Sequence, residues 1–267
     1  MTSLSIANWT VNSVRLRADM IARYAAERTP DILCLQEIKC REAEFPASVF
    51  AKLGYHHLAV SGQKGMHGVA TLSKRPLEVL ETPDFCRHGE ARTLRVRIEG
   101  LDIDNLYVPA GGDDPDPDAN PKFDHKLDFV ARMAAGYAAR RSKTNRPLIV
   151  VGDLNIAPGE HDVWSHKQLL KVVSHTPVEV DGLNKVIAAG GFTDLARVWK
   201  PDPEKLFTWW SYRSADWTKN NRGRRLDHIW VDDTDAVQLN DFAIDIAWRS
   251  EPKPSDHAPV LAELNVT

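Results

Sequence analysis

Four groups of polar residues stand at the ends of apolar, strand-like runs in the sequence. In an α/β protein such positions open into the crevice where ligands bind. Most of these side chains are carboxylates or amides, and one is an imidazole, which titrates near neutral pH. The residues are Glu37, Asp153, Asn155, Asp227, Asp256 and His257.

Each group, taken alone, also has an ordinary structural interpretation. Glu37 could cap a helix instead of binding a hard cation. If their segment is extended, Asp153 and Asn155 share a face and their side chains converge; the alternative is an Asx turn that closes the strand. Asp227 could orient another side chain or be a solvated strand end. The adjacent acid and histidine at 256 and 257 would more often face solvent.

Taken together, the groups point to one kind of chemistry. Carboxylate and amide oxygens suit Mg²⁺ or Mn²⁺, and the set offers neither a thiolate nor a histidine cluster for zinc. A divalent ion neutralises a phosphate, a carboxylate activates water, and cationic or amide groups take up the developing charge. The residues therefore predict metal-assisted phosphoester hydrolysis.

Composition limits the classes of protein that could carry such a site. Of the 267 residues, 43% are hydrophobic and 27% are charged, which predicts a packed core and excludes a disordered chain. A formal charge of −3 excludes a uniformly basic coat but allows a local basic face. Three scattered cysteines argue against a disulfide framework and against a zinc site. Without an apolar run of about 18 residues or a secretion-type N-terminus, we expect a cytoplasmic protein with no membrane partner.

Strands and helices alternate along the chain and must position these residues. Near-continuous apolar runs at 31–36 and 147–152 predict strands covered on both faces. Helical periodicity runs from 13 to 28 and from 123 to 141. Further strands are expected at 68–73, 94–98, 101–103, 105–108, 226–231, 243–248 and 259–264. This order predicts mixed sheets packed with helices, in one domain spanning residues 1–267.

Five sets of motifs lie in a fixed order along nearly the whole chain. They are Leu-Gln-Glu-Ile-Lys at 35–39, Gly-Gln-Lys-Gly at 62–65 with Gly-Val-Ala at 68–70, Gly-Asp-Leu-Asn at 152–155, Asn-Arg-Gly at 221–223 with the acid at 227, and Ser-Asp-His-Ala-Pro at 255–259. In this order and spacing the chain resembles the exonuclease III family of apurinic/apyrimidinic endonucleases, within the endonuclease–exonuclease–phosphatase superfamily. The resemblance implies a four-layer α/β sandwich of two packed mixed sheets flanked by helices.

The resemblance also implies a role for each residue of the site. Glu37 should be a principal Mg²⁺ ligand, with Asn12 and Asp256 near the same ion, which Asp153 and Asn155 can also reach. Asp153 should activate or position the attacking water, and Asn155 should steady the phosphate oxyanion. The remaining expected members are His257 on the scissile phosphate, Asp227 holding His257, and Tyr107 as the active-site tyrosine.

The N-terminal motif departs from the family pattern. The family typically reads Trp-Asn-x-Asn, whereas this chain has Thr10 between Trp9 and Asn12. Asn8 would share a strand face with Thr10 but lie about 6–7 Å along the strand. A threonine hydroxyl donates one hydrogen bond and lacks the reach of a carboxamide. We therefore expect weakened activity, which asparagine at position 10 should restore.

A basic segment follows an aromatic one near the C-terminal third of the chain. Residues 213–225 carry five basic side chains and one acid, directly after the aromatic-rich 207–212. This composition suits phosphate contact combined with stacking. By resemblance Trp209 faces the abasic sugar pocket. The acidic residues 113–118 should repel phosphates and therefore face away from the duplex. The weaker candidates for backbone contact are Lys64, His67, Arg92, Lys122 and Arg222.

The leading hypothesis is a monomeric Mg²⁺-dependent (or Mn²⁺-dependent) DNA repair phosphodiesterase. It would cut double-stranded DNA 5′ to abasic sites and would also act at 3′ ends as a 3′-5′ exonuclease and 3′-phosphatase. One alternative is a phosphatase of the same superfamily with a non-nucleic substrate. Another is a catalytically weak DNA-binding paralogue, suggested by Thr10. The segment 158–183 gives no clear structural signal.

Overall fold

The fold consists of two six-stranded mixed sheets. The computed structural model describes residues 2–214 and 216–267. One sheet has the order β11-β12-β1-β2-β4-β3 and the other β5-β6-β7-β8-β10-β9, with β1–β2 and β7–β8 as parallel pairs. The first sheet contains β1 (Thr2–Thr10), β2 (Ile32–Gln36), β3 (His57–Ser61), β4 (Val69–Ser73), β11 (Val237–Ile244) and β12 (Val260–Val266). The second contains β5 (Glu78–Val79), β6 (Thr93–Ile98), β7 (Leu101–Tyr107), β8 (Leu148–Asp153), β9 (Thr193–Asp194) and β10 (Asp227–Val231).

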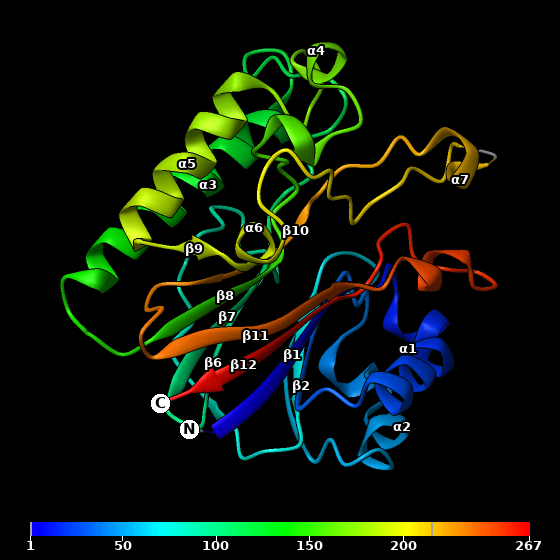
Figure 1. Ribbon diagram of the computed structural model, residues 1–267, viewed down its shortest axis with the longest axis vertical. Helices are drawn as coiled ribbons and strands as arrows, with labels where there is room; N and C mark the ends of the chain where they lie inside the picture. The colour runs from blue at the N-terminus through cyan, green and yellow to red at the C-terminus, as the bar shows by residue number, and fades with distance from the viewer. Residues whose placement is uncertain (1, 215) are drawn as a thin grey trace.

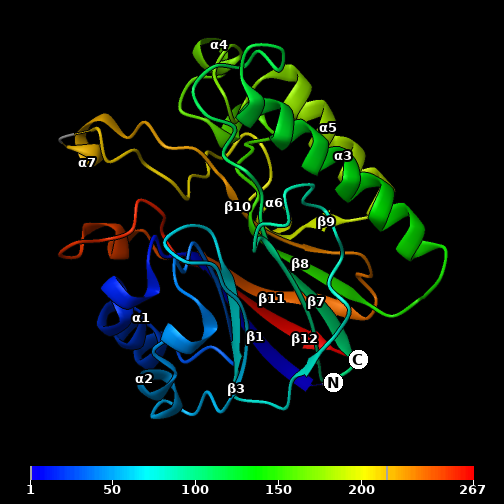
Figure 2. The same cartoon turned by 180° about the vertical axis from the view of Figure 1, so that it is seen from behind.

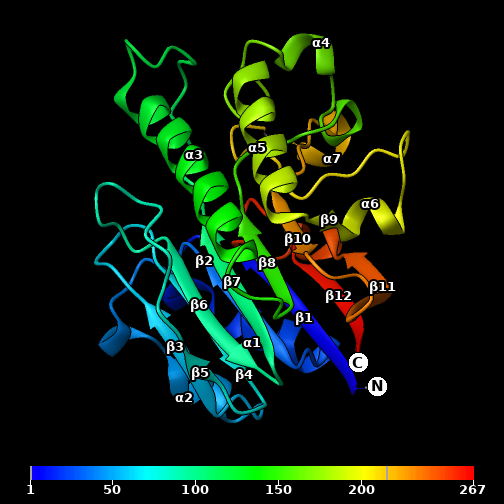
Figure 3. The same ribbon diagram turned by 90° about the vertical axis from the view of Figure 1, so that its left-hand side faces the viewer.

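Helices cover the outer face of each sheet, which gives four layers (Figure 1, Figure 2 and Figure 3). The first sheet is covered by α1 (Val14–Arg28) and α2 (Ala47–Ala51), and the second by α3 (Pro121–Arg141) and α5 (Pro177–Gly190). The inner faces of both sheets meet in one apolar core, and each helical layer has a core of its own. The predicted four-layer α/β sandwich is confirmed.

Short helical segments lie in the connections between these elements. They are α4 (His166–Leu169), α6 (Leu195–Trp199), α7 (Trp217–Asn220) and the 3-10 turns η1 (Glu42–Glu44), η2 (Glu160–Asp162) and η3 (Ile246–Ser250). The start of β1 and the end of β12 lie side by side inside the first sheet, where Thr2 pairs with Val266 (Figure 1). No helix in residues 2–214 and 216–267 is long and apolar enough to cross a bilayer.

Local sequence sets the ends of the helices that flank the second sheet. Asn120 caps α3 by accepting a backbone hydrogen bond, and Pro121 occupies its first position. A capping box between Thr176 and Glu179 starts α5, and Gly191 ends it in the left-handed conformation. The start of α5 falls within the segment that the sequence left unassigned.

The predicted strand at 243–248 is wrong for residues 245–248. Strand β11 ends at Ile244, and the 3-10 turn η3 follows. The backbone N–H of Trp248 donates to the carbonyl of Asp245, and the Trp248 ring packs edge-on against Trp9. Packing of this indole in the outer core therefore replaces strand pairing. The two short strands expected between 101 and 108 form the single strand β7.

Candidate active site

The register of the strands brings the predicted polar residues together at neighbouring strand ends in both sheets. In the second sheet Asp153, at the end of β8, pairs with Asp227 on β10 and with Tyr107 on β7. In the first sheet Thr10, at the end of β1, pairs with Gln36 at the end of β2. The hydroxyl of Thr10 lies 3.2 Å from Asp227 Oδ1, so the strand ends of the two sheets are in direct contact here.

Asp153, Asp227 and His257 form what we call the buried group. His257 Nδ1 lies 2.7 Å from Asp227 Oδ2, and His257 Nε2 lies 3.8 Å from Asp153 Oδ2. Both acids are 1% exposed and His257 is 4% exposed. Asp227 is therefore a buried carboxylate that orients His257, and neither residue is solvated as the ordinary interpretations require.

Burial and charge together shift the pKa values of the buried group. Burial alone would lower the pKa of His257, but the carboxylates of Asp227 and Asp153 outweigh it and raise the pKa to about 10. Burial raises the pKa of Asp153 well above its usual range; His257 opposes this shift and the negative charge of Asp227 adds to it. The histidine is thus a cation at neutral pH, and Asp153 accepts a proton more readily than an exposed carboxylate.

A turn, not an extended strand, brings Asp153 and Asn155 together. Strand β8 ends at Asp153, and Asn155 has a left-handed φ of 51°. The backbone N–H of Asn155 donates to Asp153 Oδ1 at 2.9 Å, which makes an Asx turn. Its Nδ2 donates to Asp153 Oδ2 at 3.1 Å and to the carbonyl of Val108 at 2.9 Å. The prediction of a shared extended face is wrong, and the amide of Asn155 orients Asp153.

Glu37, Lys39 and Asn12 form what we call the rim group. The Glu37 carboxylate accepts a hydrogen bond from the Tyr107 hydroxyl and lies 2.9 Å from Lys39 Nζ. Its side chain is 20% exposed, far more than the acids of the buried group. Glu37 caps no helix in the part of the chain that the structure describes, because the next helical turn begins at Glu42.

The rim group is able to hold a cation. The Lys39 ammonium contacts both the Glu37 carboxylate and the Asn12 amide oxygen, so these oxygens already converge on one positive charge. The carboxylate of Asp256 accepts a hydrogen bond from the Trp209 indole at 3.0 Å. These oxygen donors fit a hard divalent cation such as Mg²⁺ or Mn²⁺.

Sequence reasoning missed Lys39, although the residue belongs to a motif that it singled out. Glu37 and Lys39 both have left-handed backbone conformations, with φ of 51° and 52°. With this local geometry the Lys39 ammonium reaches both Glu37 and Asn12, and residue types alone give no signal for it. The left-handed conformation is uncommon for such residues, so sequence patterns would place them in an ordinary extended end of β2.

Thr10 and Asn8 occupy different environments, so one does not substitute for the other. The Thr10 hydroxyl is fully buried and lies 3.2 Å from both Gln36 Oε1 and Asp227 Oδ1. Asn8 lies deeper in the sheet, where its Oδ1 accepts from Gln36 Nε2 at 2.7 Å. Of these two residues, Thr10 is therefore the one whose side chain contacts the buried group.

A cavity of about 640 Å³ opens beside the buried group and the rim group. Its wall includes Trp209, Trp164 and Arg222, and the guanidinium of Arg222 stacks 4.6 Å from the Trp164 ring. Residues of the unassigned segment 158–183 supply much of this wall. Asp113 also lines the cavity, so the expectation that residues 113–118 face away is wrong for this acid.

Two arginines of the basic segment have structural roles. Arg225 is 1% exposed and forms ion pairs with Asp162 at 2.6 Å and Asp194 at 2.7 Å. Arg224 donates to Ser174 Oγ at 2.7 Å and stacks 5.1 Å from the Trp209 ring. The basic segment therefore offers DNA fewer charges than its composition indicates.

The predicted DNA-contact residues fall into two sets. Lys64, Lys122 and Arg222 are exposed, and Arg222 lines the cavity. The prediction for Arg92 is wrong, because its guanidinium is buried, bonds to the Tyr107 carbonyl at 3.2 Å and lies 4.8 Å from the Tyr107 ring. His67 is partly buried between the rings and acids of the same region.

A two-sheet sandwich with an acid–imidazole group and an oxygen-donor rim at one edge has the equipment of a phosphoester hydrolase. The chain belongs to the Endonuclease/Exonuclease/phosphatase family, whose model matches residues 10–257. This family assignment agrees with the resemblance carried by the sequence motifs.

Relatives cover almost the whole chain. It is 30% identical to exodeoxyribonuclease III of Haemophilus influenzae, over 97% of this chain and 99% of that protein. Its fold matches an AP endonuclease from Archaeoglobus fulgidus with a TM-score of 0.89 at 32% identity, covering 98% of this chain and 100% of the other. It also matches the 3′ phosphatase NExo from Neisseria bound to a product DNA hairpin, with a TM-score of 0.88 at 30% identity over 98% and 99% of the chains.

Proposed function

We propose that the protein is a Mg²⁺-dependent DNA repair phosphodiesterase that cuts duplex DNA 5′ to abasic sites. The same centre would act at 3′ ends as a 3′-5′ exonuclease and a 3′-phosphatase. The observation that carries this proposal is the placement of His257, Asp153 and Glu37 around one cavity with an aromatic and basic wall. Relatives that are AP endonucleases, 3′ phosphatases and exodeoxyribonuclease III support the same substrate class.

The rim group would hold the divalent ion. Glu37 is its principal ligand, with Asn12 and Asp256 beside it, and the bound ion supplies charge neutralisation to the phosphate. Tyr107 fixes the Glu37 carboxylate through its hydroxyl group. The Lys39 ammonium must give up part of its contact with these oxygens, which ties ion binding to a local rearrangement.

The buried group would carry the proton chemistry. Asp153 takes a proton from the attacking water, because burial favours its protonated form. His257, cationic and held by Asp227, donates a hydrogen bond from Nε2 to the scissile phosphate. Asn155 keeps Asp153 aimed at the cavity; to donate to the phosphate oxyanion, it must first release one of its two present acceptors.

The cavity wall would hold the DNA. Trp209 offers an aromatic face to an unpaired site, and its indole N–H is fixed on Asp256. Arg222, Lys64 and Lys122 are exposed and can meet backbone phosphates, which predicts binding that weakens with salt. We further propose that the protein acts as a cytoplasmic monomer, in accord with its three free cysteines.

An abasic duplex incubated with the protein, in Mg²⁺ and in EDTA, tests this proposal. Nicking in Mg²⁺ that stops in EDTA supports it. Absence of binding to the duplex instead supports a phosphatase with a non-nucleic substrate.

The second candidate is a catalytically weak DNA-binding paralogue. It is favoured by Thr10, which contacts Asp227 where the family pattern has asparagine. Binding of the abasic duplex without cleavage in Mg²⁺ would select this alternative.

A further inference from the structure

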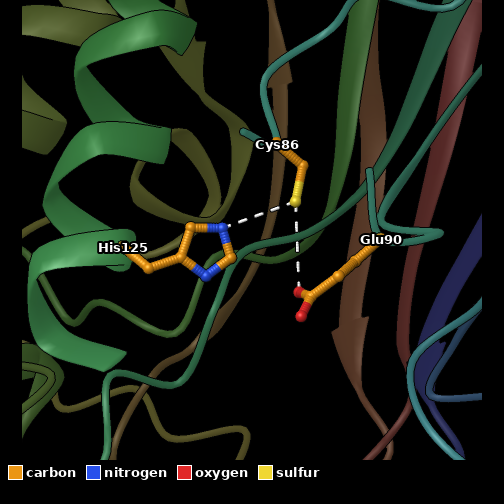
Figure 4. A group of neighbouring side chains, drawn as sticks. All are labelled: Cys86, Glu90 and His125. Carbon is orange, nitrogen blue, oxygen red and sulfur yellow. Dashed lines mark hydrogen bonds between the residues drawn. The ribbon is translucent and has the colours of Figure 1, made fainter. Parts of the chain in front are cut away.

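Three side chains outside the catalytic region point at one another between a loop and a helix. Cys86 and Glu90 lie in the connection between β5 and β6, and His125 lies in the first turns of α3 (Figure 4). Cys86 Sγ lies 3.4 Å from His125 Nε2 and 4.0 Å from Glu90 Oε2. The three ligand atoms all lie within 4.8 Å of one another.

The separation between the sulfur and nitrogen atoms matches that of two ligands on one tetrahedral ion. With a zinc–sulfur distance of about 2.3 Å and a zinc–nitrogen distance of about 2.0 Å, tetrahedral angles put the two atoms about 3.5 Å apart. The observed Sγ–Nε2 separation of 3.4 Å agrees with this value. The wider Sγ–Oε2 separation of 4.0 Å needs only a more open angle at the ion.

The chemistry of the three residues suits a transition ion and not Mg²⁺. A thiolate and a carboxylate together carry two negative charges, which balance a divalent ion, and thiolate sulfur selects zinc-like ions over hard cations. His125 points its Nε2 at the Cys86 sulfur, so its imidazole is placed to act as the nitrogen ligand. Cys86 is 5% exposed and His125 6%, which shields such a site from competing water.

Neighbouring residues complete the surroundings of the cluster. Arg92 donates to Glu90 Oε2, which leaves this oxygen one further lone pair, and His67 Nε2 lies 3.5 Å from Glu90 Oε1. Such outer contacts orient a metal ligand. The exposed ring of His88 lies 4.3 Å from the His125 ring and can supply a fourth ligand after a rotamer change.

We propose that Cys86, Glu90 and His125 form a second metal site, for Zn²⁺ or a similar transition ion, which fastens the β5–β6 connection to α3. Cysteine spacing does not predict such a site, because Cys86 and Glu90 come from the β5–β6 connection whereas His125 comes from α3. The β5–β6 connection includes Arg92, which donates a hydrogen bond to the Tyr107 carbonyl and lies over the Tyr107 ring. The site therefore also steadies the support of Glu37, although it does not depend on the proposed nuclease activity.

Cobalt is the probe that separates this site from the catalytic centre. Cysteine thiolate bound to Co²⁺ gives an intense charge-transfer band in the near ultraviolet, and the catalytic residues include no cysteine. Metal-free protein titrated with Co²⁺ should develop this band at one ion per chain, and Zn²⁺ should abolish it by displacement. Absence of the band from the folded wild-type protein would overturn the proposal.

Matched variants assign the band to these residues. Cys86→Ser should remove it, whereas Cys40→Ser, at another buried free cysteine, should keep it. His125→Asn retains the thiol and should weaken Co²⁺ binding at least about tenfold. A band that survives in Cys86→Ser, or that is unchanged in His125→Asn, contradicts the site.

Thiol protection keeps the proposal testable if Cys86→Ser does not fold. Zn²⁺ should slow alkylation of Cys86 in the wild-type protein by at least about tenfold, as measured on its peptide by mass spectrometry. It should leave the alkylation rate of Cys40 unchanged. Equal alkylation rates at Cys86 with and without Zn²⁺ would show that no ion binds there.

Discussion

Asp153 and Asp162 are equally buried, at 1% exposure, yet their pKa values are shifted in opposite directions. Burial would raise the pKa of both carboxyls. At Asp162 the guanidinium groups of Arg225 and Arg197 overcome burial and hold the pKa below its usual range. At Asp153 burial dominates, the cationic His257 opposes it only in part, and the pKa stays well above its usual range.

This difference in pKa distinguishes Asp162, which stabilises the fold, from Asp153, which can exchange a proton. Asp162 accepts two hydrogen bonds from Arg225 and one from Arg197. These ion pairs compensate its charge and connect η2 to the residues just before β10. Asp153 lines the cavity, and its Oδ2 lies 3.8 Å from Nε2 of the cationic His257. A buried acid left partly uncompensated beside a cavity is poised to exchange a proton.

The largest expected effect is on the rate of DNA cleavage after Asp153→Asn. The variant cannot take a proton, so nicking of an abasic duplex should slow by about 10²–10⁴-fold. Its Tm should be equal to or above that of the wild type, since the change removes a buried carboxyl with a raised pKa. Asp128→Asn on the surface of α3 is the matched control and should keep the full rate.

Asp162→Asn should show the reverse pattern. It leaves the buried guanidinium of Arg225 with a weaker partner, and it should lower the free energy of unfolding by about 3–5 kcal/mol. Denaturant melts measure this loss, and Asp128→Asn should cost no more than about 0.5 kcal/mol. If Asp162→Asn lost its activity while keeping its stability, the two acids would not be distinguished as described.

The pH dependence of stability sharpens the same comparison. A carboxyl whose pKa is lowered on folding stabilises the native state above its unfolded pKa of about 3.9, and this stabilisation is lost as the pH falls further. The wild type should therefore lose stability below about pH 4 more steeply than Asp162→Asn, as urea midpoints at several pH values would show. Parallel pH profiles would mean that the arginines do not hold the Asp162 charge.

A smaller effect is expected where the rim group meets the second sheet. Tyr107→Phe removes the hydrogen bond to the Glu37 carboxylate, a loss of about 1.5–3 kcal/mol, which corresponds to about 10- to 100-fold in nicking rate. Tyr137→Phe removes a buried hydroxyl that bonds to Asp104 at 2.9 Å, and neither of these residues lines the cavity described above. This control should lower stability and leave the nicking rate of the folded protein unchanged.

The smallest expected effect is a gain from Thr10→Asn. A carboxamide at this position can reach past Asp227 toward the phosphate, and about 1 kcal/mol from one added hydrogen bond corresponds to about fivefold in rate. Single-turnover nicking measures the change. A rate that is equal or lower would refute the view that threonine weakens this centre.

The sequence was sufficient to predict where the acids of the site lie, because Asp153, Asp227 and Glu37 stand at strand ends whose apolar runs are plain to read. The apolar runs predicted mixed sheets packed with helices, and the resemblance carried by the motifs implied the four layers. The sequence could not show which charged side chains form ion pairs inside the protein. From the sequence, Arg225 belongs to a basic segment that suits DNA contact. In the fold it pairs with Asp162, which is 63 residues away in the chain.

Pairing across the fold and local backbone geometry account for the other errors. Arg92 is buried against Tyr107, 15 residues away on the next strand, and only the register of β6 and β7 reveals this contact. Asn155 reaches Asp153 through a left-handed turn that strand periodicity does not predict. Cys86 and His125 are 39 residues apart and belong to no spacing motif.

The most direct test of the account is the Mg²⁺ dependence of abasic-site nicking by the wild type and by Glu37→Gln. The wild type should be inactive in EDTA and should saturate with Mg²⁺, because Glu37 is the principal ligand of an ion on which cleavage depends. Glu37→Gln should need at least about tenfold more Mg²⁺ to reach half its maximal rate. Nicking in EDTA, or the same half-saturating Mg²⁺ concentration in both proteins, would contradict a metal-dependent centre built on Glu37.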